Sequence, residues 1–139
     1  MVEDHPDSRD ALRQVLEYLG ARVVTAGSGP DALQVLKLAS SLPDLILADI
    51  RMPGMDGLEL AHVLDKDLRW RGIRRAAVTG GTSMADIRAT LEAGYGAHIV
   101  KPVDPDALLA ALQRVLGQPA PRRTATRSRR GRPRRPRSA

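Results

Sequence analysis

Asp49 is the residue whose setting most clearly predicts chemistry. It follows the apolar run Leu45 to Ala48, which predicts a short buried strand, and it begins the stretch Asp-Ile-Arg-Met-Pro-Gly-Met-Asp-Gly, in which Pro and Gly break regular structure. Asp49 is therefore expected at the carboxyl end of a strand, where open parallel sheets bind their ligands. A carboxylate buried there needs a cation or a hydrogen-bond donor as its partner.

Three other segments place polar groups at comparable positions. The acidic pair Glu3-Asp4 lies near the start of the chain, while Thr79 and Lys101 each end an apolar stretch and precede Gly or Pro. Because the carboxyl ends of parallel strands lie on one edge of a sheet, these four residues should converge on Asp49.

Such a cluster predicts phosphoryl chemistry. Three carboxylates in one pocket repel one another, and a hard divalent cation such as Mg2+ holds them together through oxygen ligands. The spare carboxylate oxygen of Asp49 could then attack phosphorus, while the Lys101 ammonium and the Thr79 hydroxyl neutralise charge on the transferred oxygens. The product would be an aspartyl phosphate, with Mg2+ as the cofactor.

At these positions the chain resembles the receiver domains of two-component response regulators. The resemblance covers residues 1 to about 117 and rests on four motifs in family order, namely Glu3-Asp4, Asp49 to Gly57, Thr79-Gly80 and Lys101-Pro102. It implies that a histidine kinase or a histidine phosphotransfer protein phosphorylates Asp49. The protein would then be a phosphoacceptor and not an enzyme, apart from self-catalysed phosphorylation and dephosphorylation.

The resemblance also implies the metal ligands. Asp4, Asp49 and the backbone carbonyl of Arg51 would bind Mg2+ directly, and Glu3 would bind it through water. Lys101 would contact the phosphoryl group.

Two switch residues follow from the same resemblance. Thr79 would sense the phosphoryl group, and His98 falls where the family usually has an aromatic residue or His that swings inward on activation. A half-buried His between Ala97 and Ile99 is equally consistent with a packing residue.

Three other functions compete with this interpretation. Haloacid-dehalogenase-like phosphatases also use a strand-end Asp, and they normally have a second Asp two residues later as the general acid. Arg51 occupies that position here, so the phosphatase interpretation lacks its acid. The chain could also be the receiver fragment of a hybrid sensor histidine kinase, or a DNA-binding protein that acts through a basic tail.

Alternating signals predict a doubly wound α/β fold. Helical periodicity and the predicted caps Ser28, Asp56 and Asp104 indicate helices over residues 12–19, 28–39, 57–64, 83–93 and 105–116. Strands are expected at residues 22–25, 45–48, 76–79 and 97–100. Together with a strand at the amino terminus, these elements give a flavodoxin-like five-stranded parallel sheet of order 2-1-3-4-5.

The first strand of this sheet is predicted to be truncated. Only Met1 and Val2 precede the acidic pair, whereas strands usually run to about five residues. A native start upstream of Met1, or excision from a larger protein, would explain the difference.

Composition separates one domain from an appendage. The 139 residues include no Cys and no apolar run near twenty residues, so a disulfide scaffold, a secretory signal and a membrane span are not expected. A cytoplasmic protein is expected instead. The formal net charge is +6, but residues 118–139 contain nine Arg and no acid, so the domain at residues 1–117 carries −3.

The tail at residues 118–139 is expected to be disordered, because it has almost no large apolar residues to bury. Its segment Arg130-Gly131-Arg132-Pro133 resembles the core of an AT-hook, which would lay Arg130 and Arg132 into the minor groove of A·T-rich DNA. The motif has only four residues, of types that abound in Arg- and Pro-rich tails, so chance or a GC-rich coding bias is the better explanation for it. Nonspecific attraction of the Arg residues to nucleic acid needs no motif. The expected output is either this tail or a protein contact on the face formed by the fourth helix, fifth strand and fifth helix.

Overall fold

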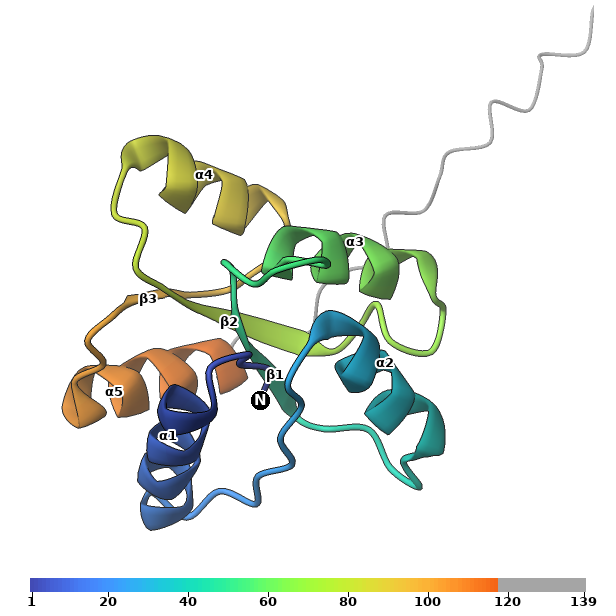
Figure 1. Cartoon of the computed structure of the whole chain (residues 1–139), viewed down its shortest axis with the longest axis horizontal. Coiled ribbons are helices and arrows are strands. Elements are labelled where there is room, and N and C mark those ends of the chain that lie inside the picture. Colours follow the sequence, from blue (N-terminus) through green and yellow to red (C-terminus); the bar gives the residue numbers. More distant parts are fainter. Residues whose placement is uncertain (118–139) are drawn as a thin grey trace, which may run out of the picture.

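The computed structural model describes residues 1–117, which form five helices around a parallel sheet (Figure 1). The elements in order are α1 (Pro6–Tyr18), α2 (Gly29–Leu38), β1 (Leu45–Asp49), α3 (Gly57–Lys66), β2 (Arg74–Thr79), α4 (Met84–Glu92), β3 (His98–Val100) and α5 (Pro105–Leu116). From Leu45 onward this order confirms the predicted alternation of strands and helices.

Polar caps determine where most of these helices begin. At the start of α2, α3, α4 and α5 the cap side chain accepts a hydrogen bond from the backbone N–H three residues on, and the caps are Ser28, Asp56, Ser83 and Asp104. Such a bond satisfies one of the donors that a helix leaves unpaired at its amino end. The predicted caps Ser28, Asp56 and Asp104 are therefore confirmed.

The predicted count of five strands is wrong for the described residues, which contain three. Strands β1, β2 and β3 pair in parallel in that order. Val2 makes only isolated parallel bridges, to Ala26 on one side and to Ala48 on the other. The predicted spatial order is thus kept. In place of the first two strands of that order, however, Ala26 and Val2 form single bridges, and residues 22–25 form no strand.

The short amino terminus explains this loss. Val2 donates to the Leu47 carbonyl at 2.8 Å and accepts from the Asp49 N–H at 2.9 Å, while Ala26 donates to the Met1 carbonyl at 2.9 Å. A strand exists only where a neighbour continues the ladder of hydrogen bonds. Residues 22–25 have Met1 as their last neighbour on that side, so their ladder ends there.

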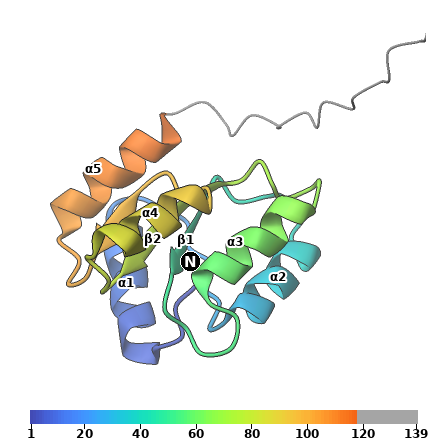
Figure 2. The same ribbon diagram turned by 90° about the horizontal axis from the view of Figure 1, so that it is seen from above.

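Helices cover both faces of the sheet, as Figure 2 shows. One face packs against α2 and α3 through a buried apolar set, Ala32, Leu36, Leu60, Ala61 and Leu64. The other face packs against α1 and α5 through a second set, Leu12, Leu16, Leu108, Ala111 and Val115. Alternate residues of β1 serve the two faces, which confirms the doubly wound α/β architecture.

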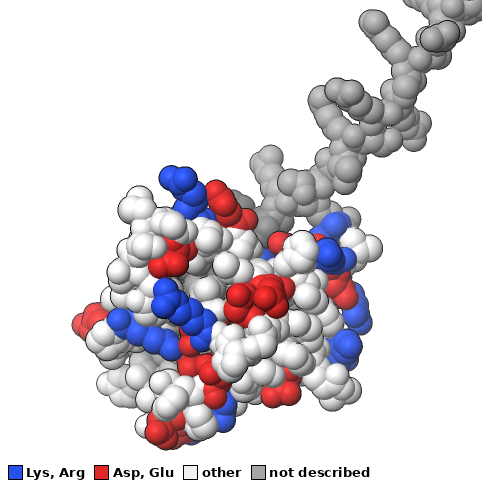
Figure 3. All heavy atoms as spheres, turned by 45° about the horizontal axis from the view of Figure 1, so that its top comes forward, with Lys and Arg blue, Asp and Glu red and all other residues white. Residues whose placement is uncertain are grey.

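The surface of the described residues carries mixed charge. Acidic and basic side chains are interspersed over the face in Figure 3, in keeping with the small net charge of residues 1–117. Among these residues no helix has both the length and the apolar character needed to cross a bilayer. The predicted disordered tail, with Arg130 and Arg132, lies outside the described residues.

The amino group of Met1 predicts a pH dependence of stability. It donates to the Val24 carbonyl at 2.8 Å, and burial lowers its pKa from 8.0 to about 6. The unfolded chain therefore binds more protons between pH 6 and 8, so the free energy of unfolding should rise with pH across this window, by up to about 2 to 3 kcal/mol.

Urea unfolding at pH 6, 7 and 8 measures this rise. The matched control is the same chain acetylated at Met1, which has no amine to titrate but retains every His. The free-amine chain should gain more stability from pH 6 to 8 than the acetylated chain. Equal gains in the two chains would contradict the burial of a charged amine.

Candidate functional site

Asp49 ends β1 and is 5% exposed. Its Oδ1 accepts a hydrogen bond from the Arg51 N–H at 3.1 Å. Helix α3 begins against this strand end, because the Gly57 N–H donates to the Ile50 carbonyl at 2.8 Å. A Cβ at Gly57 would lie 2.6 Å from the Asp49 carbonyl oxygen, so only Gly allows this close approach. The chain following β1 thus holds Asp49 at the predicted sheet edge.

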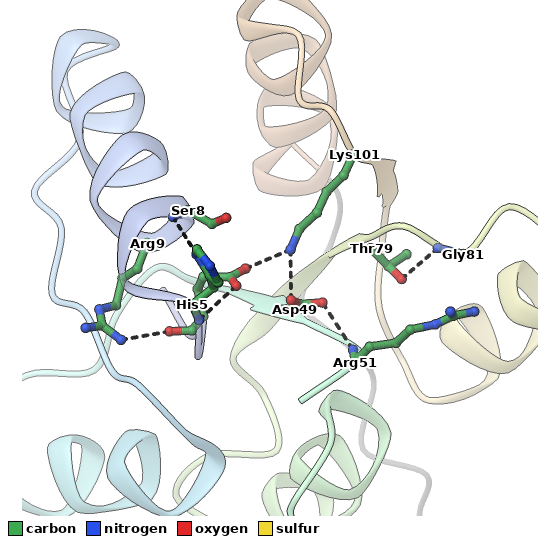
Figure 4. Close-up of polar contacts among 9 residues, drawn as sticks. His5, Ser8, Arg9, Asp49, Arg51, Thr79, Gly81 and Lys101 are labelled. Carbon is green, nitrogen blue, oxygen red and sulfur yellow. Dashed lines mark hydrogen bonds and ion pairs between the residues drawn. The ribbon is translucent and has the colours of Figure 1, made fainter. Parts of the chain in front are cut away.

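Lys101 supplies the cation that a buried Asp49 needs. It follows β3, and its Nζ lies 2.8 Å from Asp49 Oδ2 and 3.0 Å from Glu3 Oε2 (Figure 4). Glu3 is 2% exposed, whereas Lys101 is 31% exposed at its side chain. The peptide bond between Lys101 and Pro102 is cis. One ammonium therefore neutralises two carboxylates, one near the amino terminus and one at the end of β1.

Burial and ion pairing together shift the pKa values of Lys101 and Glu3. Burial acts to lower the pKa of Lys101, but its bonds to Asp49 and Glu3 outweigh burial and raise that pKa. The pKa of Glu3 is raised, chiefly by burial, although the Lys101 bond opposes the rise. Lys101 thus stays charged at neutral pH, and Glu3 holds its proton more tightly than an exposed Glu.

The acidic cluster has the donors that a hard cation requires. Glu3, Asp4 and Asp49 each offer one carboxylate oxygen, and these oxygens all lie within 4.8 Å of one another. Oxygen donors with several negative charges are the preferred ligands of Mg2+. The predicted convergence of the acidic pair on Asp49 is therefore observed, and the residues present fit the ion.

Thr79 and His98 are joined through Gly81. Thr79 ends β2, is 2% exposed and accepts the Gly81 N–H at its Oγ1 over 3.1 Å. His98 Nε2 lies 2.8 Å from the Gly81 carbonyl. A carbonyl only accepts, so Nε2 carries the proton. The sequence analysis assigned no role to Gly81, so this link was missed.

Comparison with known proteins shows the family of this chain. The model of the response regulator receiver domain matches residues 1–113. The chain belongs to the response regulator receiver domain family. Sequence and structure thus agree on the fold for the part of the chain that carries Glu3, Asp49, Thr79 and Lys101.

Several relatives illustrate this membership. A 14.6 kDa protein of the sodA1 3′ region of Leptolyngbya boryana is 36% identical over 113 residues, which are 81% of this chain and 85% of that protein. The chemotaxis protein CheY4 of Vibrio cholerae superposes with a TM-score of 0.74 at 30% identity, covering 82% of this chain and 93% of that one.

Longer relatives contain the receiver domain as one part. The nitrate/nitrite response regulator NarP of Escherichia coli is 34% identical over 116 residues, which are 81% of this chain but 52% of NarP. The sensor histidine kinase CheAY of Helicobacter pylori is 31% identical over 113 residues, 14% of its length. The chain therefore spans about half of NarP and a small part of CheAY.

Arg51 connects the site of this receiver domain to α4. Its backbone N–H binds Asp49, while its exposed guanidinium lies 3.5 Å from Asp86 of α4. The sequence interpretation assigned the Arg51 carbonyl to Mg2+, which stays a prediction, and it missed this ion pair. Spacing within the sequence gives no signal for the pair, because Asp86 approaches only when β1 and β2 lie side by side.

Two buried polar residues, Tyr95 and Arg75, hold the helices next to the site in place. The Tyr95 hydroxyl donates to the Gly57 carbonyl at 2.7 Å and so ties the start of α3 to the end of α4. Arg75, which is 3% exposed on β2, pairs with Asp65 of α3 and donates to the Ala93 carbonyl at 3.1 Å. Neither contact was foreseen, because charged residues at a strand start are usually solvated.

Proposed function

We propose that Asp49 accepts a phosphoryl group from a histidine kinase or a histidine phosphotransfer protein in the cytoplasm, with Mg2+ as cofactor. The observation that carries the proposal is the buried Asp49 carboxylate, which has an ammonium at 2.8 Å and the oxygens of Glu3 and Asp4 within 4.8 Å. A structural ion pair gives no reason for a third carboxylate at such a distance, whereas a bound divalent cation would offset the repulsion among the three.

The residues of the site divide the chemistry among themselves. The Arg51 N–H orients the carboxylate through Oδ1, so that one oxygen of Asp49 attacks phosphorus as the bond to the donor histidine nitrogen breaks. Lys101 pairs with the incoming phosphoryl oxygens in place of its present partner oxygen. Mg2+, when bound by Glu3, Asp4 and Asp49, supplies charge neutralisation to the same oxygens.

Thr79 and His98 would carry the phosphorylated state to the surface. A Thr79 hydroxyl that turned toward the phosphoryl group would release the Gly81 N–H, and Gly81 also holds His98. Next to these residues, α4 and β3 expose three large apolar side chains, Met84, Leu91 and Val100. An altered surface at α4 and β3 would then be recognised by an output protein.

Phosphoryl uptake tests the proposed function. Incubation of the purified chain with Mg2+ and acetyl phosphate should add one phosphoryl group per molecule, measured by intact mass. Chelation of Mg2+ should prevent uptake, and hydroxylamine should remove the group, because it cleaves acyl phosphates. Failure to take up phosphate, or uptake that resists hydroxylamine, would contradict the proposal.

A further inference from the structure

Arg9, near the start of α1, reaches back to the acidic pair. Its Nη1 donates a hydrogen bond to the backbone carbonyl of Glu3 at 3.1 Å (Figure 4). Helical side chains lean toward the amino end of their helix, so a long side chain at this place can reach the segment that precedes α1. The half-buried Arg9 therefore contacts the backbone of the proposed Mg2+ site.

Glu3 is held at each of its polar groups. Its N–H donates to the Ala26 carbonyl at 3.1 Å, while its carbonyl accepts from Arg9. Its Oε1 accepts from the His5 N–H at 3.2 Å, and its Oε2 accepts from Lys101 at 3.0 Å. Of these bonds, the one from Arg9 holds the peptide unit that leads onward along the chain.

Asp4 depends on this peptide unit for its position. Within the residues that the structure describes, Asp4 takes part in no hydrogen bond or ion pair, although its carboxylate belongs to the acidic cluster. A peptide unit is planar, so a fixed Glu3 carbonyl also fixes the nitrogen and Cα of Asp4. The bond from Arg9 therefore places the backbone from which the Asp4 carboxylate reaches the cluster.

Gly27 makes room for the Arg9 guanidinium. A Cβ at Gly27 would lie 3.0 Å from Arg9 Nη1 and 3.9 Å from Arg9 Cζ. The first distance is shorter than an ordinary van der Waals contact, so the guanidinium lies directly against the glycine. Gly27 follows Ala26, whose carbonyl accepts the Glu3 N–H. One short segment thus contacts both Arg9 and Glu3.

Charge and position give Arg9 opposite effects on a metal ion. A guanidinium near three carboxylates repels a divalent cation, so on charge alone its removal should strengthen Mg2+ binding. A guanidinium that holds a metal ligand in place prepares the site, so its removal should weaken Mg2+ binding. The sign of the change therefore distinguishes the two roles.

We propose that Arg9 is a positioning residue of the metal site, which holds the peptide between Glu3 and Asp4 so that Asp4 meets Asp49 around a divalent cation. The bond of Arg9 goes to a neutral carbonyl, so it fixes geometry and neutralises no carboxylate. This role rests on the proposed function, because it concerns the Mg2+ bound there.

Mg2+ titration of the whole chain tests this role. Arg9→Met keeps most of the length of the side chain but has neither a donor nor a charge, so the Mg2+ affinity measured by calorimetry should fall roughly tenfold. Saturating Mg2+ should return the rate of phosphoryl uptake from acetyl phosphate to the wild-type value, because Asp49 and Lys101 are unchanged.

Two further variants separate position from charge. Arg13→Met removes a guanidinium from the same helix that pairs with Asp10 and Glu17, so its Mg2+ affinity should equal or slightly exceed that of the wild-type chain. Gly27→Val keeps every charge but places a side chain against the Arg9 guanidinium. It should weaken Mg2+ binding in the same direction as Arg9→Met.

Hydrogen exchange without Mg2+ gives a second readout. In Arg9→Met the amides of Glu3 and His5 should exchange faster, because their hydrogen bonds belong to the loosened segment. The amide of Ala77, which donates to the Ala97 carbonyl within the sheet, should keep its rate. An equal increase at all three amides would show general destabilisation and overturn the positioning role.

The titrations distinguish the failure of this role from the failure of the proposed function. An Mg2+ affinity of Arg9→Met equal to or above that of the wild-type chain would overturn the role of Arg9 and leave the proposed function standing. A wild-type chain that bound no Mg2+ would contradict the proposed function itself, and the role of Arg9 with it.

Discussion

Asp49→Asn is expected to abolish phosphoryl uptake from acetyl phosphate. The Asn side chain keeps the shape of Asp and can still accept the Arg51 N–H, but its amide has no anionic oxygen to attack phosphorus. Lys101 retains Glu3 as its partner, so the domain should stay folded. Intact mass after incubation with Mg2+ should show no added phosphoryl group.

Asp56→Asn is the matched control for this experiment. Asp56 lies in the same Pro- and Gly-rich stretch and caps α3 through the Glu59 N–H at 2.8 Å, a role that Asn fills equally well. Uptake should equal that of the wild-type chain. Undiminished uptake by Asp49→Asn would overturn the assignment of the phosphoacceptor.

Asp4→Asn is expected to weaken Mg2+ binding by roughly tenfold or more. It removes one of three negative charges whose oxygens lie within 4.8 Å, while the amide oxygen keeps the shape of the site. Phosphorylation at a fixed Mg2+ concentration should slow in parallel, and saturating Mg2+ should restore part of the rate. Calorimetric titration with Mg2+ measures the affinity directly.

Asp7→Asn controls for the loss of a nearby charge. Asp7 is an exposed acid in the first turn of α1 and lies outside the acidic cluster. Its removal takes away one negative charge at this end of the domain, as Asp4→Asn does, so any general electrostatic effect appears in both variants. Equal Mg2+ affinity in Asp4→Asn and Asp7→Asn would exclude Asp4 as a ligand.

The candidate site was predictable from sequence because each of its groups ends an apolar run. Asp49, Thr79 and Lys101 follow stretches that form strands wherever parallel neighbours exist, and parallel strands bring their ends together. Spacing does not reveal which atoms then pair. The link from Thr79 through Gly81 to His98 depends on loop geometry, which residue types alone do not determine.

The strand count was wrong for a physical reason. Residues 22–25, Arg-Val-Val-Thr, have strong strand propensity, and this propensity supported the prediction of a strand. Propensity alone does not supply a hydrogen-bonding neighbour, and only Met1 and Val2 are present to provide one. Burial of Arg75 was unpredictable in the same way, because its partners are Asp65 of α3 and Ala93 just after α4, and only the fold brings them to it.

The contacts of Arg75 have a consequence for how α4 can move. Its guanidinium holds the Ala93 carbonyl just after the helix, deep in the protein, whereas the solvated pair of Arg51 and Asp86 joins the first turn of α4 to the loop after β1. A helix anchored at one end tilts about that end. A displacement that starts at Thr79 would reach α4 at its amino end through Gly81, so the helix would tilt about Ala93 and Met84 would move farthest.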